Sequence, residues 1–151
     1  MTDKKDTACL ELKSGRVTIQ LRPDLAPQHV ARIKELIRQG YYDGLKFHRV
    51  IKGFMAQTGC PEGTGMGGSG QKINAEFTRE PFVRGTVGMA RSTNPDSGDS
   101  QFFITFGETP HLDGAYTVWG QVIDGMEHVD KIAPGEPPRE PDTIIKFFLA
   151  S

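Results

Sequence analysis

Several features that would assign this chain to a membrane, a nucleic acid or an oxidising compartment are scarce or missing from its sequence. No stretch approaches the ~18 consecutive apolar residues of a membrane-spanning helix, and the N-terminal segment MTDKKDTACLELKSG lacks the apolar core of a secretory signal. The formal net charge is −1, whereas nucleic-acid-binding domains usually carry a basic patch. We therefore expect a cytoplasmic protein with no membrane segment and no nucleic-acid partner.

Cysteine is equally scarce, with Cys9 and Cys60 as the two examples in the chain. The two could pair in principle, but nothing else in the sequence indicates an oxidising compartment, so we predict two reduced thiols. None of the four histidines has a second His, Cys or carboxylate at a familiar ligand spacing. The sequence therefore predicts neither a metal nor another cofactor.

Two motifs resemble catalytic or nucleotide-binding signatures but lack their context. Gly63, Gly65 and Gly68 fit the spacing G-x-G-x-x-G, yet the following SGQKINAEF does not open a helix, and Gln71 stands where a Walker A loop needs lysine. The serines of RSTNPDSGDSQ lie outside any G-x-S-x-G elbow. Neither nucleotide binding nor serine hydrolysis is favoured.

Alternating and helical patterns are clear near the N-terminus. ACLELKSGRVTIQL predicts a β-hairpin turning at Ser14-Gly15, with two apolar faces of period two: Ala8, Leu10 and Leu12, then Val17, Ile19 and Leu21. APQHVARIKELIRQG predicts a helix that has Pro27 in its first turn and Gly40 just past its end. Its apolar stripe comprises Val30, Ile33, Leu36 and Ile37.

The rest of the chain consists mainly of short strand-like segments, at 46–51, 54–58, 86–90, 101–106, 116–123 and 143–148. GMEHVDKI predicts a second, shorter helix with Met126, Val129 and Ile132 facing inward. With the hairpin, this gives eight strands and two helices, which favours a sandwich or a closed barrel. The glycine-rich region 59–84 is long for a loop, and such loops are usually functional or disordered.

Alternation also separates two faces in the middle of the chain. Phe102, Ile104 and Phe106 can fill a core, where we also place Trp119. The other face would form an apolar surface with a few polar groups, typical of a small binding cleft: Arg49, Met55, Gln57, Gln101 and Phe103. The alternative is that Arg49 extends from its strand and pairs with an acid such as Glu76 or Glu80.

Three long segments in order, FHRVIKGFMAQTG, GMARSTNPDSGDSQFFITF and HLDGAYTVWGQVIDGMEHVDKI, resemble the cyclophilin family of peptidyl-prolyl cis-trans isomerases, and in particular its compact bacterial members. The resemblance extends from about Thr7 to Leu149. It implies a mainly β fold, a closed eight-stranded antiparallel β-barrel capped by two α-helices. The whole chain, 1–151, would then be one isomerase domain with its core at about 7–149.

The resemblance also implies site residues. The catalytic positions fall on Arg49 and on Gln57, which with Gln101 would contact the substrate backbone and hold the arginine. The proline pocket falls on Phe54, Met55, Phe103 and Leu112. The rest of the substrate path falls on Ala90, Arg91, Gly63, Thr64, His111 and Tyr116.

Three of these positions depart from the family pattern. Arg91 stands where Asn is frequent, Tyr116 where the pocket has a histidine, and His111 where many eukaryotic members have the tryptophan that binds cyclosporin. The resemblance implies an isomerase that acts on X-Pro bonds of peptides and of unfolded or folding proteins without a cofactor, and His111 indicates weak cyclosporin binding. No exposed apolar helix demands a partner subunit, so we expect a monomer. The alternative is a proline-peptide binding or chaperone-like module with little turnover.

Overall fold

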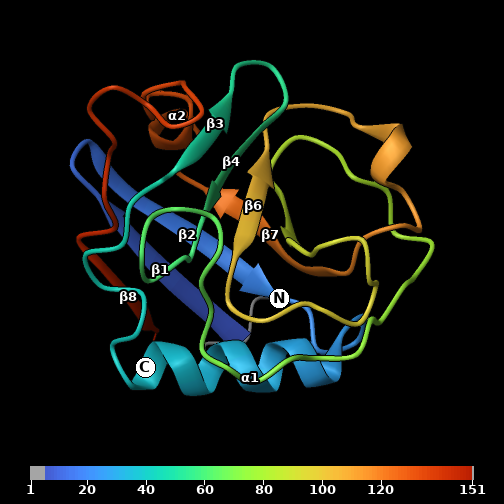
Figure 1. The fold of residues 1–151 in the computed structure, drawn as a ribbon. Coiled ribbons are helices and arrows are strands. Elements are labelled where there is room, and N and C mark those ends of the chain that lie inside the picture. Colours follow the sequence, from blue (N-terminus) through green and yellow to red (C-terminus); the bar gives the residue numbers. More distant parts are fainter. Residues whose placement is uncertain (1–5, 151) are drawn as a thin grey trace.

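The computed structural model describes residues 6–150, in which eight antiparallel strands form one curled sheet with an α-helix at either end (Figure 1). The strand order is β3-β4-β6-β5-β7-β2-β1-β8. The elements in chain order are β1 (Thr7–Leu12), β2 (Gly15–Leu21), α1 (Pro27–Arg38), β3 (Arg49–Ile51), β4 (Met55–Thr58), β5 (Thr86–Met89), β6 (Phe102–Thr105), the 3-10 helix η2 (Pro110–Leu112), β7 (Val118–Asp124), α2 (Met126–Val129) and β8 (Lys146–Leu149).

The prediction of a closed barrel is wrong, because the sheet is an open half-barrel. Within residues 6–150, the end strands β3 and β8 do not pair with each other. Irregular segments occupy the gap instead: Val50 of β3 exchanges two 2.8 Å backbone hydrogen bonds with Gly135, and Phe47 N donates to Asp142 O at 2.9 Å. These bonds satisfy the outer edge of β3, so closure by another strand is not required.

The predicted hairpin forms, with its turn one residue earlier than expected. Gly15 already pairs with Leu12, so Lys13 and Ser14 are the turn residues. A Cβ on Gly15 would lie 2.4 Å from Nε2 of His128, so glycine is required where the α2 segment packs on β2. The predicted inward positions of both strands are buried, from Ala8 at 0% exposure to Leu12 at 6%.

The main core lies on one face of the curled sheet and includes residues from all eight strands and from both α-helices. Trp119, predicted as a core residue, is completely buried and meets the ring of Phe102 edge to face at 5.3 Å. α2 is shorter than predicted and ends at Val129, but Val129 and Ile132 are both buried as expected. No helix in the described part of the chain is long and apolar enough to cross a membrane.

α1 runs along the lower end of the sheet in Figure 1, and its predicted stripe is buried. Its N-terminus has no local side-chain cap, because Ala26 precedes it. Glu76 caps it from the long loop instead: its carboxylate accepts from the backbone N–H groups of Gln28 at 3.2 Å and His29 at 2.8 Å. The buried His29 ring also bonds Glu76, Nδ1 to Oε1 at 2.6 Å. The loop is thus fixed to the helix.

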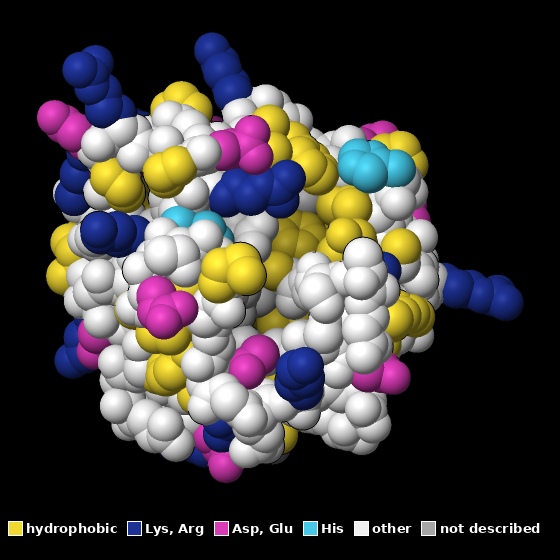
Figure 2. Space-filling view, viewed as in Figure 1, with side chains coloured by type: hydrophobic (Ala, Val, Ile, Leu, Met, Phe, Trp, Pro, Cys, Tyr) yellow, Lys and Arg dark blue, Asp and Glu magenta, His cyan; other side chains and the backbone are white. Residues whose placement is uncertain are grey.

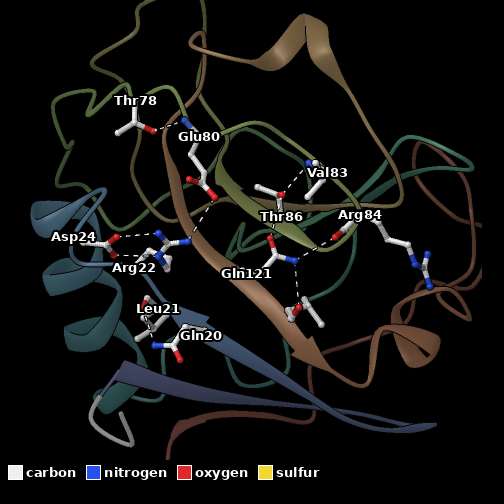
Figure 3. A network of polar contacts seen from close by, with 11 residues as sticks. Gln20, Leu21, Arg22, Asp24, Thr78, Glu80, Val83, Arg84, Thr86 and Gln121 are labelled. Atoms are coloured by element: carbon white, nitrogen blue, oxygen red, sulfur yellow. Dashed lines mark hydrogen bonds and ion pairs between the residues drawn. The ribbon is translucent and has the colours of Figure 1, made fainter. Parts of the chain in front are cut away.

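Figure 3 shows a second set of polar contacts on the outer side of the sheet. Arg22 makes a bidentate pair with Asp24, at 3.0 and 2.9 Å, and a longer contact of 3.6 Å with Glu80. Gln121 of β7 donates to the carbonyl of Arg84 at 3.1 Å and accepts from the hydroxyl of Thr86 at 3.3 Å. The bonds of Gln121 hold the start of β5 and Arg84 before it against β7, and Arg22 links Glu80 to the segment after β2.

Loss of the Glu76 cap should destabilise the fold. We expect Glu76→Ala to lower the free energy of unfolding by about 1–2 kcal/mol, because α1 loses its cap and buried His29 loses its partner. Glu80→Ala is the matched control, since Glu80 forms a surface pair and should change stability by less than about 0.5 kcal/mol. Urea unfolding of both variants gives the comparison. Equal losses would contradict the capping role.

Candidate active site

A second, smaller hydrophobic cluster lies on the opposite face of β4 and β6 from the main core. Its buried members come from three strands, the loop before β5 and the 3-10 helix: Met55, Phe82, Phe103, Leu112 and Val118. The ring of Phe103 stacks on that of Phe82 at 5.7 Å between centroids. An apolar cluster that lies outside the main core and close to the surface is where a ligand can be held.

The register of the sheet sets polar side chains beside this cluster. Arg49 of β3 lies opposite Gln57 of β4, and Gln57 lies opposite Phe103 of β6. Side chains on directly paired residues point to the same face. The predicted face therefore forms, with a cation at its edge, an amide in its middle and an aromatic ring beyond.

Between these side chains lies a cavity of about 110 Å³. Figure 2 shows this face of the molecule: hydrophobic side chains line a hollow, and basic and acidic side chains lie next to each other at its edge. Every residue that lines the cavity is among the predicted site residues: Arg49, Phe54, Met55, Gln57, Ala90, Arg91, Phe103, Leu112 and Tyr116.

A larger cavity of about 300 Å³ adjoins the first and shares Gln57, Ala90 and Arg91 with it. Gln101, also predicted, belongs to this second cavity. The long glycine-rich loop contributes five lining residues, and the segment before β6 contributes three more: Gly65, Met66, Gly67, Gly68 and Lys72, then Ser92, Ser97 and Asp99. The loop thus has a defined place beside the site, as its length suggested.

Hydrogen bonds join the cation to this loop through two amides. Arg49 Nη1 donates to Gln57 Oε1 at 3.4 Å, and Gln57 Nε2 donates to Gln101 Oε1 at 2.9 Å. Gln101 Nε2 then donates to the carbonyls of Gly65 and Gly67, both at 2.9 Å. Each amide is fixed at both ends, so its orientation is determined by the chain of contacts.

The departures Arg91 and Tyr116 act as a pair. The Arg91 guanidinium lies 4.5 Å above the centre of the Tyr116 ring and donates to the carbonyls of Ala115 and Ser92. The Tyr116 ring in turn meets Phe103 edge to face at 5.7 Å. Arg91 therefore braces the aromatic wall of the cavity.

Three predicted residues lie outside the lining of both cavities. His111 of η2 packs its ring against Phe54 at 5.3 Å between centroids, so it borders the cavity from behind a lining residue. Gly63 and Thr64 lie in the loop just before Gly65, where the Thr64 hydroxyl accepts from Met66 N at 3.2 Å. They directly precede Gly65, the first loop residue in the lining of the larger cavity.

Arg49 does form an ion pair, but not with the acids that the sequence suggested. Glu76 is bound to His29 and Glu80 to Arg22. The partner of Arg49 is Glu136, whose Oε1 lies 3.0 Å from Nε. Both side chains remain about half exposed, at 44% for Arg49 and 57% for Glu136.

Sequence reasoning missed Glu136, Phe82 and Gly88. A Cβ on Gly88 would lie 2.7 Å from the Phe82 ring and 2.8 Å from that of Phe103, so glycine in β5 makes room for the stacked pair. A glycine inside a strand pattern often indicates such a close approach, so Gly88 was the feature of the sequence that could have indicated the stacked rings. Phe82 lies in an irregular segment with no alternation, and Glu136 lies 87 positions from Arg49.

Cys60 lies at the base of the glycine-rich loop and is fully buried. Its sulfur accepts from the backbone N–H groups of Gly65 at 3.3 Å and Gly67 at 3.2 Å. Burial raises the pKa of the thiol, but the loop N–H groups lower it more, and the pKa falls from 9.0 to about 7. Both cysteines are free thiols, as predicted.

The arrangement suits binding and electrostatic stabilisation. Within residues 6–150, no three His, Cys, Asp or Glu side chains are grouped so as to hold a metal ion. The lining of the smaller cavity comprises the guanidinium-bearing Arg49 and Arg91, the amide of Gln57, Tyr116 and apolar side chains. Such a site can enclose a small apolar ring and place a cation beside it.

Comparison with known proteins gives one consistent result. Residues 7–147 match the family model described as "Cyclophilin type peptidyl-prolyl cis-trans isomerase/CLD". A "Probable peptidyl-prolyl cis-trans isomerase" of Brucella suis biovar 1 is 53% identical over 164 residues, covering 97% of this chain and 84% of the relative.

Solved structures agree. Cyclophilin AquaCyp293 from Hirschia baltica has a TM-score of 0.91 at 29% identity, covering 98% of this chain and 75% of that one. A Cryptosporidium parvum cyclophilin type peptidyl-prolyl cis-trans isomerase, in the presence of dipeptide ala-pro, has a TM-score of 0.90 at 29% identity, covering 96% and 99%.

The lowered pKa of Cys60 can be measured directly. In a Cys9→Ala variant, the ultraviolet absorbance of the thiolate should rise with a midpoint at about pH 7, two units below the ordinary value of 9.0. Because the folded pKa lies below the unfolded one, the thiolate's contribution to stability should be present above pH 9 and be lost as pH falls to about 7. A midpoint near 9 would contradict the role of the loop N–H groups.

Proposed function

This chain belongs to the cyclophilin-type peptidyl-prolyl cis-trans isomerase family, and we propose that it turns X-Pro bonds in the cavity between Arg49 and Phe103. The observation that carries the assignment of the site is the row Arg49–Gln57–Phe103, which sets a cation at the rim of a small apolar cavity. The whole chain would act as one isomerase domain.

Prolyl isomerisation makes and breaks no covalent bond. The amide must turn about a partial double bond, with a barrier of about 18–20 kcal/mol, and the uncatalysed exchange takes tens to hundreds of seconds. The site therefore needs neither a nucleophile nor a proton donor of tuned acidity. It needs groups that bind the twisted amide more tightly than the planar one.

Arg49 can make that distinction. In the twisted amide the proline nitrogen loses resonance and becomes a hydrogen-bond acceptor. A guanidinium held at the rim can donate to this nitrogen only when the bond has turned, so the interaction favours the transition state. Arginine side chains remain charged throughout the working pH range, which makes the donor permanent.

The apolar walls supply the second contribution. The twisted amide is less polar than the planar one, so transfer into a dry cavity costs it less free energy. Met55, Phe103 and Leu112 are nearly or fully buried and would enclose the proline ring while the preceding residue rotates. Gln57, held by Gln101, would bind the substrate backbone and fix that part of the chain.

Magnitudes limit what Arg49 does alone. A rate gain of ~10⁵ corresponds to about 7 kcal/mol, and one charge-assisted hydrogen bond supplies about 1.5–3 kcal/mol. The remainder must come from desolvation and from dipoles that are oriented before the reaction starts. The fixed amides of Gln57 and Gln101 are dipoles of this kind.

The proposed substrates are proline-containing peptides and unfolded or folding proteins. The Cryptosporidium relative was solved in the presence of the dipeptide ala-pro, which supports proline-containing peptides as ligands of the proposed site. We propose further that the chain acts as a monomer in the cytoplasm. We also propose weak cyclosporin binding, because His111 presents a smaller ring than tryptophan beside Phe54.

Replacement of the cation tests the proposed site. We expect Arg49→Ala to lower kcat/KM on a proline peptide by about 10- to 150-fold, the equivalent of one charge-assisted hydrogen bond. The loss should fall mainly in kcat, since the interaction forms in the transition state. NMR exchange spectroscopy on the peptide measures the rate of exchange between its cis and trans forms. Equal rates for variant and wild type would remove Arg49 from the mechanism.

Cyclosporin response tests the role of position 111. His111→Trp should lower the cyclosporin concentration needed for half-inhibition by about tenfold, equivalent to roughly 1.4 kcal/mol, because a larger ring adds apolar contact at the cavity border. Inhibition of peptide isomerisation is the measurement. Identical inhibition curves for the two proteins would show that another feature limits cyclosporin binding.

A further inference from the structure

We propose that Glu136 is a positioning residue for the reaction, and that its carboxylate fixes the Arg49 guanidinium at the rim of the smaller cavity. The proposal depends on the proposed role of Arg49. Glu136 lies in the irregular segment between α2 and β8 and lines neither of the two cavities at the site. Its effect on catalysis would therefore be exerted through the arginine.

The contact geometry makes Glu136 the stronger of two restraints on Arg49. Nε donates to Glu136 Oε1 at 3.0 Å, whereas Nη1 donates to Gln57 Oε1 at 3.4 Å. The first bond joins two charged groups at a normal length, and the second joins the cation to a neutral amide at the long limit. The two acceptors hold different nitrogens, so together they fix the plane of the guanidinium.

The restraints leave donors free for the substrate. A guanidinium has five N–H donors in a fixed planar arrangement, and Glu136 and Gln57 occupy one at Nε and one at Nη1. Among the described residues, Nη2 has no hydrogen-bond partner. A fixed arginine with unused N–H groups beside an apolar cavity is prepared to donate to an acceptor that forms there during the reaction.

Arg49 needs such a restraint because its own strand gives little. β3 is three residues long, and its first residue, Arg49, has an exposed fraction of 44% for the side chain. A long side chain at that exposure samples many rotamers, and each one that moves the guanidinium away from the cavity is unproductive. A carboxylate on the solvent side selects the productive ones.

The backbone holds Glu136 in place for this contact. Gly135 exchanges two 2.8 Å hydrogen bonds with Val50, the buried residue that follows Arg49. Glu136 follows Gly135, so the bridge brings the two charged side chains side by side. A Cβ on Gly135 would lie 2.6 Å from Cα of Pro138, and its φ of +145° is unfavourable for other residues. The local fold thus keeps the bridge next to the site.

Glu136 also places a negative charge near Arg49, and this charge opposes the electrostatic effect of the cation on the substrate amide. Both side chains are about half exposed, so water strongly attenuates the field of the carboxylate at the substrate amide beyond the guanidinium. The hydrogen bond at Nε is short-ranged and directional and is not attenuated in this way. The gain from orienting the Arg49 guanidinium therefore outweighs the loss from partly compensating its charge. For the same reason the pair adds little to stability.

Steady-state kinetics on a proline peptide test the proposal. We expect Glu136→Ala to lower kcat/KM by about 3- to 10-fold, mainly in kcat. Glu136→Gln should recover most of the activity, since its amide oxygen can still accept from Nε. Glu140→Ala is the matched control: it removes an exposed acid from the same segment and should match the wild type. Thermal unfolding of each variant checks that it is folded.

Two further measurements separate positioning from a general effect. In an Arg49→Ala background, adding Glu136→Ala should cause no further loss. The Arg49 Nε–H resonance should shift in Glu136→Ala and stay in place in Glu140→Ala. The proposal is overturned if Glu136→Ala matches Glu140→Ala in rate, or if it lowers the rate equally without Arg49. Full activity of Arg49→Ala would instead refute the proposed site itself.

Discussion

The alternation of side chains along β6 is the constraint on which the rest of the structure depends. Phe102 and Ile104 pack in the main core, while Phe103 points to the opposite face and lines the smaller cavity. The pairing of β4 with β3 and β6 extends this division to Arg49 and Gln57. A slip of one residue would exchange the two faces and bury the cation, so the register that packs the core also builds the candidate site.

The site becomes a cavity through a segment that has no regular structure of its own. The loop after β4 is held by polar contacts within itself and with other elements: Cys60 at its base accepts two of its N–H groups, Gln101 bonds two of its carbonyls, and its Glu76 caps α1. Each contact satisfies a backbone or charged group that a loop would otherwise leave exposed or unpaired. These contacts therefore fix the part of the loop that lines the larger cavity.

The wrong prediction of a closed barrel and the missed Glu136 have the same cause. Because β3 does not pair with β8, its free edge can bond the backbone of Gly135, and that bond carries Glu136 to Arg49. A strand in that place would have satisfied the same edge with a regular ladder. The opening in the sheet thus determines the environment of Arg49, the cation proposed to act in catalysis.

The sequence by itself determined the elements and the faces of the site. Period-two and helical patterns depend on neighbours along the chain, and these sufficed to set Arg49, Gln57 and Phe103 on one face and Trp119 in the core; the family resemblance added the remaining cavity residues. Only the tertiary structure decided that Arg49 pairs with Glu136, that Glu76 caps a helix, and that Gly63 and Thr64 stop short of the cavity. Such contacts join residues far apart in the chain. The sequence alone is compatible with several partners for each acid, and only the folded chain brings one of them into contact.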